Sequence, residues 1–291
     1  MTSSRGRLTK RLKVGRDAGC GPASTASEEL DRMAARRNGR GHARPRPQSP
    51  QLGHSRRTSL VLLGDFTVCD GTGSPVRLPL AGQRLVALTA LHGAPLPRHL
   101  AASRLWPHLP SVSARGSLRN AISGLQAACP GLIAADASTV RLADTVDVDI
   151  WQREAQALRV LQRDGGDPRA EEPFEGMPLL LPAWEEEWVA VERLRLQELL
   201  LYAHEAQAAR LLRRGEFALA VAAVYEVLRV DPLRESAAQL LVSAHLAEGN
   251  RAQAARCYLE FRGRLHAALG IEPSGDLRKL VAGLLRTGSG Q

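Results

Sequence analysis

The sequence predicts a mainly α protein in which an N-terminal α+β domain precedes an all-α domain of helical repeats. Three observations carry this prediction. An amphipathic helix followed by a β-hairpin lies between residues 112 and 150. Short β-prone runs and two further helical patterns come before it. In the C-terminal half, Gly215 and Gly249 occupy matching positions of a pattern that repeats after 34 residues.

Residues 1–59 are rich in Arg, Ser, Gly and Pro and poor in apolar residues, so we expect a disordered tail. They hold 14 of the 39 basic and 4 of the 30 acidic residues, which leaves 25 against 26 in residues 60–291. The net charge of +9 therefore belongs to the tail. The tail is either a basic arm with non-specific affinity for a polyanion or, as we favour, a dispensable extension from an upstream start codon.

Three short β-prone runs open the folded part, and turn residues separate them. We expect an antiparallel sheet from the runs Leu60–Leu63, Phe66–Cys69 and Val76–Leu80. Two helices should follow, because each apolar pattern ends at a helix-breaking residue. The first is Gln83–His92, which Gly93 ends, and the second is Arg98–Trp106, which Pro107 stops.

A third helix is predicted over Ser113–Cys129. Projected at about 100° per residue, its apolar side chains gather on one stripe, formed by Leu118, Ala121, Ile122, Leu125 and Cys129. The opposite face carries Arg119, Asn120 and Ser123, while Arg115 and Gln126 lie on the shoulder between the two faces. These residue types suit base edges and phosphates.

A hairpin should follow this helix, because Leu132–Ile133 and Thr139–Leu142 are β-prone runs around the turn Asp136-Ala137-Ser138. A helix followed by such a hairpin has the order of a winged helix, in which the helix enters DNA and the hairpin forms the wing. A solvated helix with a surface hairpin accounts for the same pattern.

The placement of charge favours the winged helix. Between Gly71 and Ala135 the sequence has no Asp or Glu, and it has six arginines, Arg77, Arg84, Arg98, Arg104, Arg115 and Arg119. A surface without carboxylates suits a polyanion, because each phosphate contact releases counterions and a nearby carboxylate would oppose it. This domain is therefore expected to bind DNA.

Taken together, the residues of this domain resemble the OmpR-type winged helix of the actinobacterial antibiotic regulatory proteins, the SARP-type family. The resemblance rests on Gln83-Arg84, Leu105-Trp106-Pro107, Ala114-Arg115, Leu118-Arg119 and Val140-Arg141-Leu142. It implies that the third helix reads the major groove. Towards the end of that helix relatives are more basic, whereas this chain has Gly124, Gln126 and Ala127, so we expect a modest affinity.

The C-terminal half resembles the partner domain of the same family, the bacterial transcriptional activator domain, and this match is the more specific one. The residues that carry it are Val146-Asp147-Val148-Asp149, Leu180-Leu181-Pro182-Ala183-Trp184-Glu185-Glu186-Glu187-Trp188, Glu192-Arg193, Asp231-Pro232-Leu233-Arg234-Glu235-Ser236 and Leu269-Gly270-Ile271-Glu272-Pro273. We therefore expect a winged-helix DNA-binding domain at 60–145, an activator domain with helices like tetratricopeptide repeats at 146–285 and a flexible C-terminus at 286–291.

The repeat is visible without the resemblance. Residues 214–218 align with residues 248–252, and Ala220 and Ala254 occupy matching positions where a small side chain lets helices approach. Each glycine is expected to end the helix before it. Helical repeats present a concave surface, so protein partners are the natural ligands. A purely structural all-α domain is the alternative.

These observations predict a transcriptional regulator, most simply an activator, that binds double-stranded promoter DNA. Arg115, Arg119, Asn120 and Ser123 would enter the major groove, with Gln126 at the far end. Phosphate contacts would come from the wing and from the start of the second helix, through Arg98, Thr139 and Arg141. The resemblance implies that the loop Pro107–Ser113 contacts RNA polymerase and that the protein is a homodimer through or beside the repeats.

No enzymatic step, cofactor or metal is expected. The cysteines at 20, 69, 129 and 257 lack zinc-ligand spacing, the histidines form no ligand set, and no phosphate-binding glycine loop occurs. The sequence has no signal-peptide pattern and no run of about 18 apolar residues, so a cytoplasmic protein is expected. Two other classes stay open: an adaptor whose repeats bind another regulator, and a sensor with a small ligand between the repeats.

Overall fold

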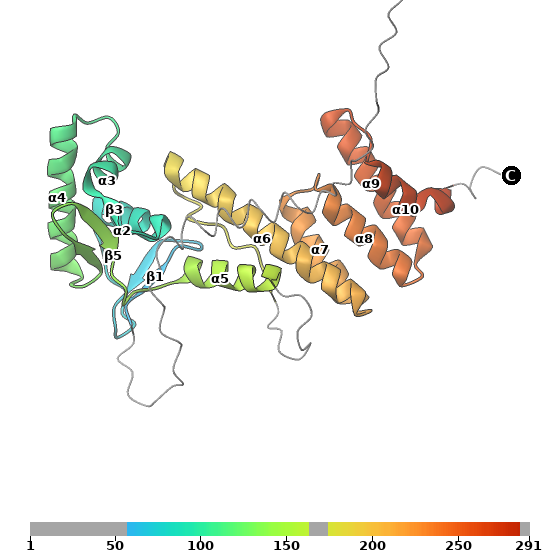
Figure 1. Ribbon diagram of the computed structural model, residues 1–291, viewed down its shortest axis with the longest axis horizontal. Coiled ribbons are helices and arrows are strands. Elements are labelled where there is room, and N and C mark those ends of the chain that lie inside the picture. Colours follow the sequence, from blue (N-terminus) through green and yellow to red (C-terminus); the bar gives the residue numbers. More distant parts are fainter. Residues whose placement is uncertain (1–56, 163–173, 286–291) are drawn as a thin grey trace, which may run out of the picture. The chain divides into compact units, whose positions relative to one another are not determined.

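The computed structural model describes residues 57–162 and 174–285. Their elements form an α+β region with two small sheets, followed by a series of packed helices (Figure 1). The predicted fold class is therefore confirmed. Most of the predicted disordered tail and the predicted flexible segment 286–291 lie outside the described residues. The tail prediction extends too far at its end, because Ser59 already belongs to strand β1 (Ser59–Val61).

The first sheet has the strand order β2-β1-β6. Strand β2 (Thr67–Cys69) is antiparallel to β1, as expected, whereas β6 (Asp147–Val148) lies parallel to β1 on its other side. The predicted strand Val76–Leu80 is wrong, since only an isolated bridge joins Pro75 to Cys69. Pro75 and Pro79 have no N–H to donate to a ladder, and the free side of β1 is occupied by β6.

Three helices follow, and they agree with the prediction within a few residues: α2 (Leu80–His92), α3 (Arg98–Leu105) and α4 (Ser111–Ala128). Helix α2 begins earlier than predicted because Pro79 serves as its N-cap. It ends at Gly93, which has φ 68° and donates its N–H to the carbonyl of Thr89. Glycine adopts this left-handed conformation without the steric cost of a Cβ.

The second sheet contains the predicted hairpin. Strands β4 (Ile133–Ala135) and β5 (Thr139–Leu142) are antiparallel, and β3 (Leu96–Pro97) adds to the other edge of β5. Leu96 pairs with Val140, which in turn pairs with Ala135. This sheet therefore ties the entry to α3 to the hairpin that follows α4.

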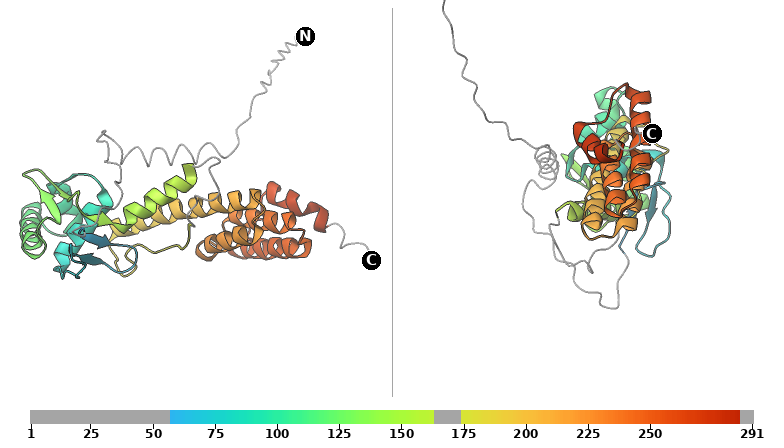
Figure 2. Two further views of the ribbon diagram at one scale, coloured as in Figure 1. Left: turned by 90° about the horizontal axis from the view of Figure 1, so that it is seen from below. Right: turned by 90° about the vertical axis from the view of Figure 1, so that its right-hand side faces the viewer.

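The remaining helices pack on one another in chain order. They are α5 (Asp149–Gln162), α6 (Glu187–Arg213), α7 (Phe217–Val230), α8 (Glu235–Ala247), α9 (Arg251–Leu269) and α10 (Gly275–Leu285). Helix α5 lies beside α6 in the left view of Figure 2 and packs against it. None of the helices in residues 57–162 and 174–285 is long and apolar enough to cross a membrane.

The predicted repeat is present in these helices. Gly215 and Gly249 follow the ends of α6 and α8 with φ 77° and 86°. Ala220 and Ala254 lie at matching places on α7 and α9, and both are buried in a continuous core with Val224, Leu241 and Phe261. The small alanine side chains allow the helices to pack closely.

Backbone contacts cross the predicted domain boundary. The N–H of Gly64 donates to the carbonyl of Leu179 at 2.8 Å, and the N–H of Leu181 donates to that of Leu62 at 3.0 Å. Leu181 has φ 40°, an unusual value for a residue with a branched side chain. Arg193 on α6 holds this segment in place by donating to the carbonyls of Leu180, Leu181 and Trp184. Much of the activator-domain signature around residue 184 is therefore structural.

Candidate nucleic-acid interface

Helix α4 has the two faces that its sequence predicts. Its buried residues are Ala114, Leu118, Ala121, Ile122 and Leu125, and Cys129 directly after the helix is also buried. The five predicted DNA-reading residues are all exposed: Arg115, Arg119, Asn120, Ser123 and Gln126. The helix has no acidic residue in its first turn and no side-chain cap at its N-terminus. It thus presents a polar, carboxylate-free face to solvent.

The side chains on this face differ in how firmly they are held. The Nε of Arg115 donates to the carbonyl of Ser111 one turn earlier, at 3.2 Å. Within residues 57–162 and 174–285, Arg119 makes no ion pair with a carboxylate. Of the two arginines on α4, Arg119 is therefore the less restrained, and it is available to a base edge or a phosphate.

The turn of the hairpin is organised by Asp136. Its carboxylate accepts hydrogen bonds from the backbone N–H groups of Ser138 and Thr139, both at 2.7 Å, and from both of their hydroxyls. These bonds hold the pKa of Asp136 well below its ordinary value, with the side-chain bond from Thr139 as the largest cause. The predicted phosphate ligand Thr139 is thus already engaged in the turn.

The two predicted phosphate-binding arginines also have partners. Arg98 at the start of α3 donates from Nη1 to the carbonyl of Asp136 at 2.8 Å, so it braces the hairpin turn. Arg141 on β5 forms an ion pair with Asp144, with Nη1 2.7 Å from the carboxylate oxygen. Asp136 and Asp144 lie just beyond residues 71–135, the stretch without Asp or Glu that we call the acid-free window. The sequence analysis missed that these two residues are partners of Arg98 and Arg141. The spacing Asp-x-Ser is itself a signal of a side-chain-closed turn.

The acid-free window contains six arginines, but one of them, Arg84, is only partly exposed and is paired with a carboxylate. The Nε of Arg84 on α2 lies 2.7 Å from the Oε1 of Glu186, at the start of α6. Arg77 and Arg104 are exposed. The window therefore overstates the cationic surface by one residue, because a long-range partner cannot be read from charge spacing along the chain.

The loop before α4 is shorter than predicted, because the helix already includes Ser111, Val112 and Ser113. Around this start two apolar side chains face solvent: Leu109 is 43% exposed and Val112 is 70% exposed. Exposed apolar side chains beside a polar helix face are a common feature of protein contact sites. The predicted polymerase contact therefore has suitable chemistry at this position.

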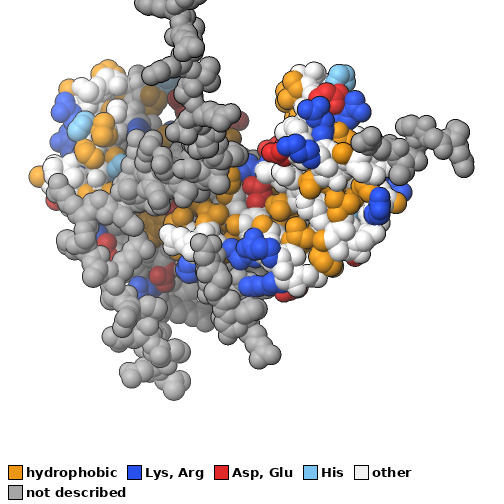
Figure 3. Space-filling model, turned by 45° about the vertical axis from the view of Figure 1, so that its right-hand side comes forward, with side chains coloured by type: hydrophobic (Ala, Val, Ile, Leu, Met, Phe, Trp, Pro, Cys, Tyr) orange, Lys and Arg blue, Asp and Glu red, His pale blue; other side chains and the backbone are white. Residues whose placement is uncertain are grey.

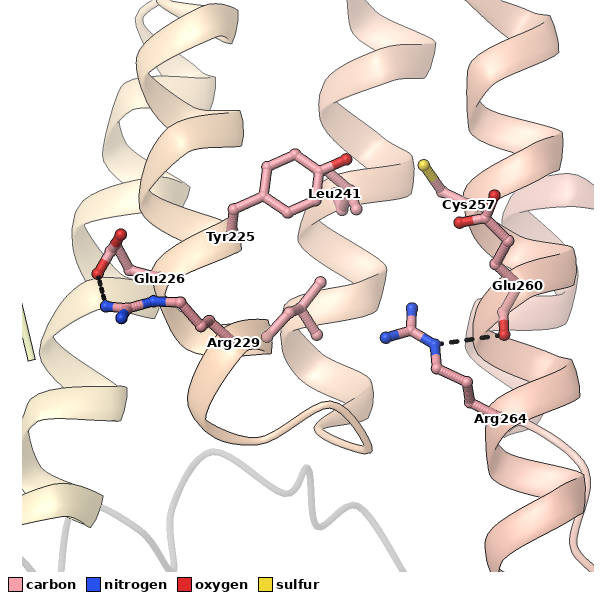
Figure 4. A pocket seen from close by; sticks show the side chains of 8 residues that line it. Tyr225, Glu226, Arg229, Leu241, Cys257, Glu260 and Arg264 are labelled. Atoms are coloured by element: carbon pink, nitrogen blue, oxygen red, sulfur yellow. Dashed lines mark hydrogen bonds and ion pairs between the residues drawn. The ribbon is translucent and has the colours of Figure 1, made fainter.

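A hollow of about 340 Å³ is lined by residues of α7 and α9 and by Leu241 of α8. Figure 4 shows Tyr225, Cys257, Glu260 and Arg264 around it, with Leu241 between the two helices. Burial raises the pKa of the Cys257 thiol, so the thiol stays protonated and is a poor nucleophile. Among the described residues no group of three His, Cys, Asp or Glu side chains could hold a metal ion.

Comparison with known proteins identifies the helical half. Residues 146–285 match the family model of the bacterial transcriptional activator domain. This part of the chain therefore forms a bacterial transcriptional activator domain. No curated protein matches the sequence.

Among solved structures, the chain is similar to Mycobacterium tuberculosis EmbR in complex with a low affinity phosphopeptide. The TM-score is 0.65 at 21% sequence identity, and the match covers 80% of this chain and 66% of that one. The chain thus spans just under two thirds of that protein's length. At this identity the likeness shows the fold, and a match over 80% of the chain extends beyond residues 146–285.

Proposed function

We propose that this chain, whose residues 146–285 form a bacterial transcriptional activator domain, is a sequence-specific DNA-binding regulator that recruits RNA polymerase to promoters. The observation that carries the proposal is the two-faced helix α4. Its apolar stripe is buried, and its exposed face bears Arg115, Arg119, Asn120 and Ser123 without any carboxylate. The fold likeness supports this reading of the α+β region as a winged helix.

Recognition would divide between base and phosphate contacts. Arg119 and Asn120 have the donors and acceptors that distinguish guanine and adenine in the major groove. Gln126, three turns further along than Arg115, would reach the far end of the site. The register on the phosphate backbone would be set by Arg98, Thr139 and Arg141. Arg141 is paired with Asp144 and would have to exchange this carboxylate for a phosphate.

Activation would work by recruitment of RNA polymerase to the promoter. The exposed Leu109 and Val112 beside the start of α4 are suited to a protein surface rather than to DNA, which supports a polymerase contact there. Self-association would use the repeats. Tyr225 and Leu259 occupy matching positions 34 residues apart and are both 50% exposed, so α7 and α9, the corresponding helices of the two repeats, each present a large hydrophobic side chain at the same place.

The experiment that tests the proposal is selection of duplexes from a random DNA library by the full chain. A regulator of this kind should enrich a defined element. Arg119→Ala should lose the preference for that element while it keeps the melting temperature. Arg159→Ala is the matched control, because Arg159 is an exposed arginine on α5, away from α4. Enrichment that is unchanged in Arg119→Ala would contradict the assignment of the reading helix.

A second candidate is an adaptor whose repeats bind another regulator while the winged helix has little DNA affinity of its own. It is favoured by the neutral residues Gly124, Gln126 and Ala127 and by the existing partners of Arg98 and Arg141. On the face drawn in Figure 3, basic, acidic and hydrophobic side chains are interspersed over the helical repeats, as suits a protein partner. A salt titration separates the two, since phosphate binding gives a steep loss of affinity with salt.

A further inference from the structure

Helix α2 is buried on every side along part of its length. The seven consecutive residues 85–91 are all buried, so this stretch has no solvent-facing side. A helix that is enclosed in this way belongs to the core rather than to one surface. It contacts α4 and α3 of the winged helix, and its ends also meet residues of the helical domain.

The contact between α2 and the reading helix is direct. A Cβ added at Gly82 would lie 2.8 Å from Cδ2 of Leu125 on α4, closer than such atoms approach. The backbone of α2 therefore touches the side chain of Leu125 without a layer of side chains between them. Because Leu125 is fully buried, it cannot move aside without disturbing the core. A displacement of α2 is thus passed on to α4.

An ion pair and a hydrogen bond join α2 to the helical domain. Arg84 and Glu186 form an ion pair with 2.7 Å between Nε and Oε1, and their side chains are 26% and 21% exposed. Glu186 is also the N-cap residue of α6. At the other end of α2, the indole N–H of Trp151 on α5 donates to the carbonyl of Ala90 at 2.9 Å. Two helices of the activator domain thus hold α2.

We propose that Arg84 and Glu186 are positioning residues for the reading helix, and that α2 couples the activator domain to DNA binding. The proposal rests on the proposed function for its DNA readout. Removing the guanidinium leaves the Glu186 carboxylate partly buried without its cation, and this favours movement of the start of α6 away from α2. Helix α4 then loses the rigid support that α2 provides at Leu125.

The test is amide hydrogen exchange on the full chain, followed peptide by peptide. In Arg84→Ala, exchange over Ser111–Ala128 should become about fivefold faster or more, the lower range of coupling between sites. The charge-swapped pair Arg84→Glu with Glu186→Arg should return it towards the wild-type rate. The matched control is Arg262→Ala, which breaks another Arg–Glu pair, 2.6 Å long, within the activator domain. It should leave α4 unchanged.

The outcomes separate positioning from loss of fold. Exchange over α4 that is unchanged in Arg84→Ala overturns the proposal, as does exchange that rises equally over α4 and α9. Glu186→Gln keeps the size of the side chain and removes its charge, so it gives the same test if Arg84→Ala does not fold.

DNA binding gives the second readout. On an element selected by the wild-type chain, Arg84→Ala should bind more weakly although it retains every residue of the reading face. If the wild-type chain selects no element, the proposed function fails, while faster exchange of α4 in Arg84→Ala still supports the coupling through α2.

Discussion

The carboxylate of Asp149 accepts a hydrogen bond from the backbone N–H of Leu62 at 3.0 Å, although 87 residues separate the two. The same carboxylate accepts from the N–H of Leu63 at 2.9 Å and from that of Ile150 at 2.7 Å. Asp149 is the first residue of α5. One side chain therefore satisfies the donors that follow strand β1 and begins the first helix of the activator domain.

Replacement of Asp149 should destabilise the chain. Asp149→Ala leaves the N–H groups of Leu62 and Leu63 without this acceptor, and we expect the free energy of unfolding to fall by about 2 kcal/mol. Asp149→Asn should lose less, because its amide oxygen still accepts. Chemical denaturation measures both. Asp65→Ala, at an exposed carboxylate nearby in the sequence, should change stability by less than about 0.5 kcal/mol. Equal losses at the two positions would contradict the role of Asp149.

Two glycines should respond in opposite ways to alanine. Gly82→Ala places a methyl group against Leu125 and should cost about 1–3 kcal/mol of stability, as overpacking does. Gly124→Ala on α4 meets nothing within 4 Å, and it should gain up to about 1 kcal/mol, because alanine favours the helix. Thermal unfolding of the pair compares them directly. A stabilising Gly82→Ala would show that α2 and α4 do not approach as closely as described.

The hairpin turn should loosen in acid. The pKa of Asp136 is lowered from its ordinary 3.8 by the hydrogen bonds from Thr139 and Ser138. Its contribution to the turn is therefore complete above the unfolded pKa of about 4, and is lost as the pH falls through the lowered pKa. An NMR titration of the Asp136 carboxyl carbon should show a midpoint below 3.8. A midpoint at or above that value would mean that the turn is not closed by this carboxylate.

Asp144 should weaken DNA binding by competing for Arg141. The carboxylate lies 2.7 Å from Nη1 of Arg141, where a phosphate would bind. Asp144→Ala should therefore raise the affinity for DNA about twofold to fivefold, the size expected of one exposed ion pair. The gain should vanish when Arg141→Ala is added. A gain that survives the second substitution would mean that Asp144 acts through general charge repulsion instead.

The sequence predicted the structural features that depend on residues close together along the chain. The buried stripe of α4 follows from the period of Leu118, Ile122 and Leu125, and the ends of α6 and α8 follow from Gly215 and Gly249. The exposed face of α4 could be predicted for the same reason, because it lies on the side of the helix opposite the buried stripe. These features need only neighbours within a few turns of one helix.

Pairings between distant segments could not be predicted in this way. The sequence analysis expected residues 76–80 to be the third strand of the first sheet, whereas the third strand is β6, because pairing depends on where the chain returns. Arg84 was counted with the cationic surface, yet its partner Glu186 lies about a hundred positions further along the chain. By contrast, the pair Arg141–Asp144 is local, and its short spacing could have indicated it.

The proposed function requires that the exposed face of α4 reads promoter DNA. Genome-wide occupancy of the tagged full chain, measured beside the double variant Arg115→Ala, Arg119→Ala, tests it most directly. We predict discrete promoter peaks that share a repeated element and disappear in the variant. Peaks that survive the double substitution, or a wild-type chain without peaks, would mean that the helical repeats carry the function and that any contact with DNA is made through a partner.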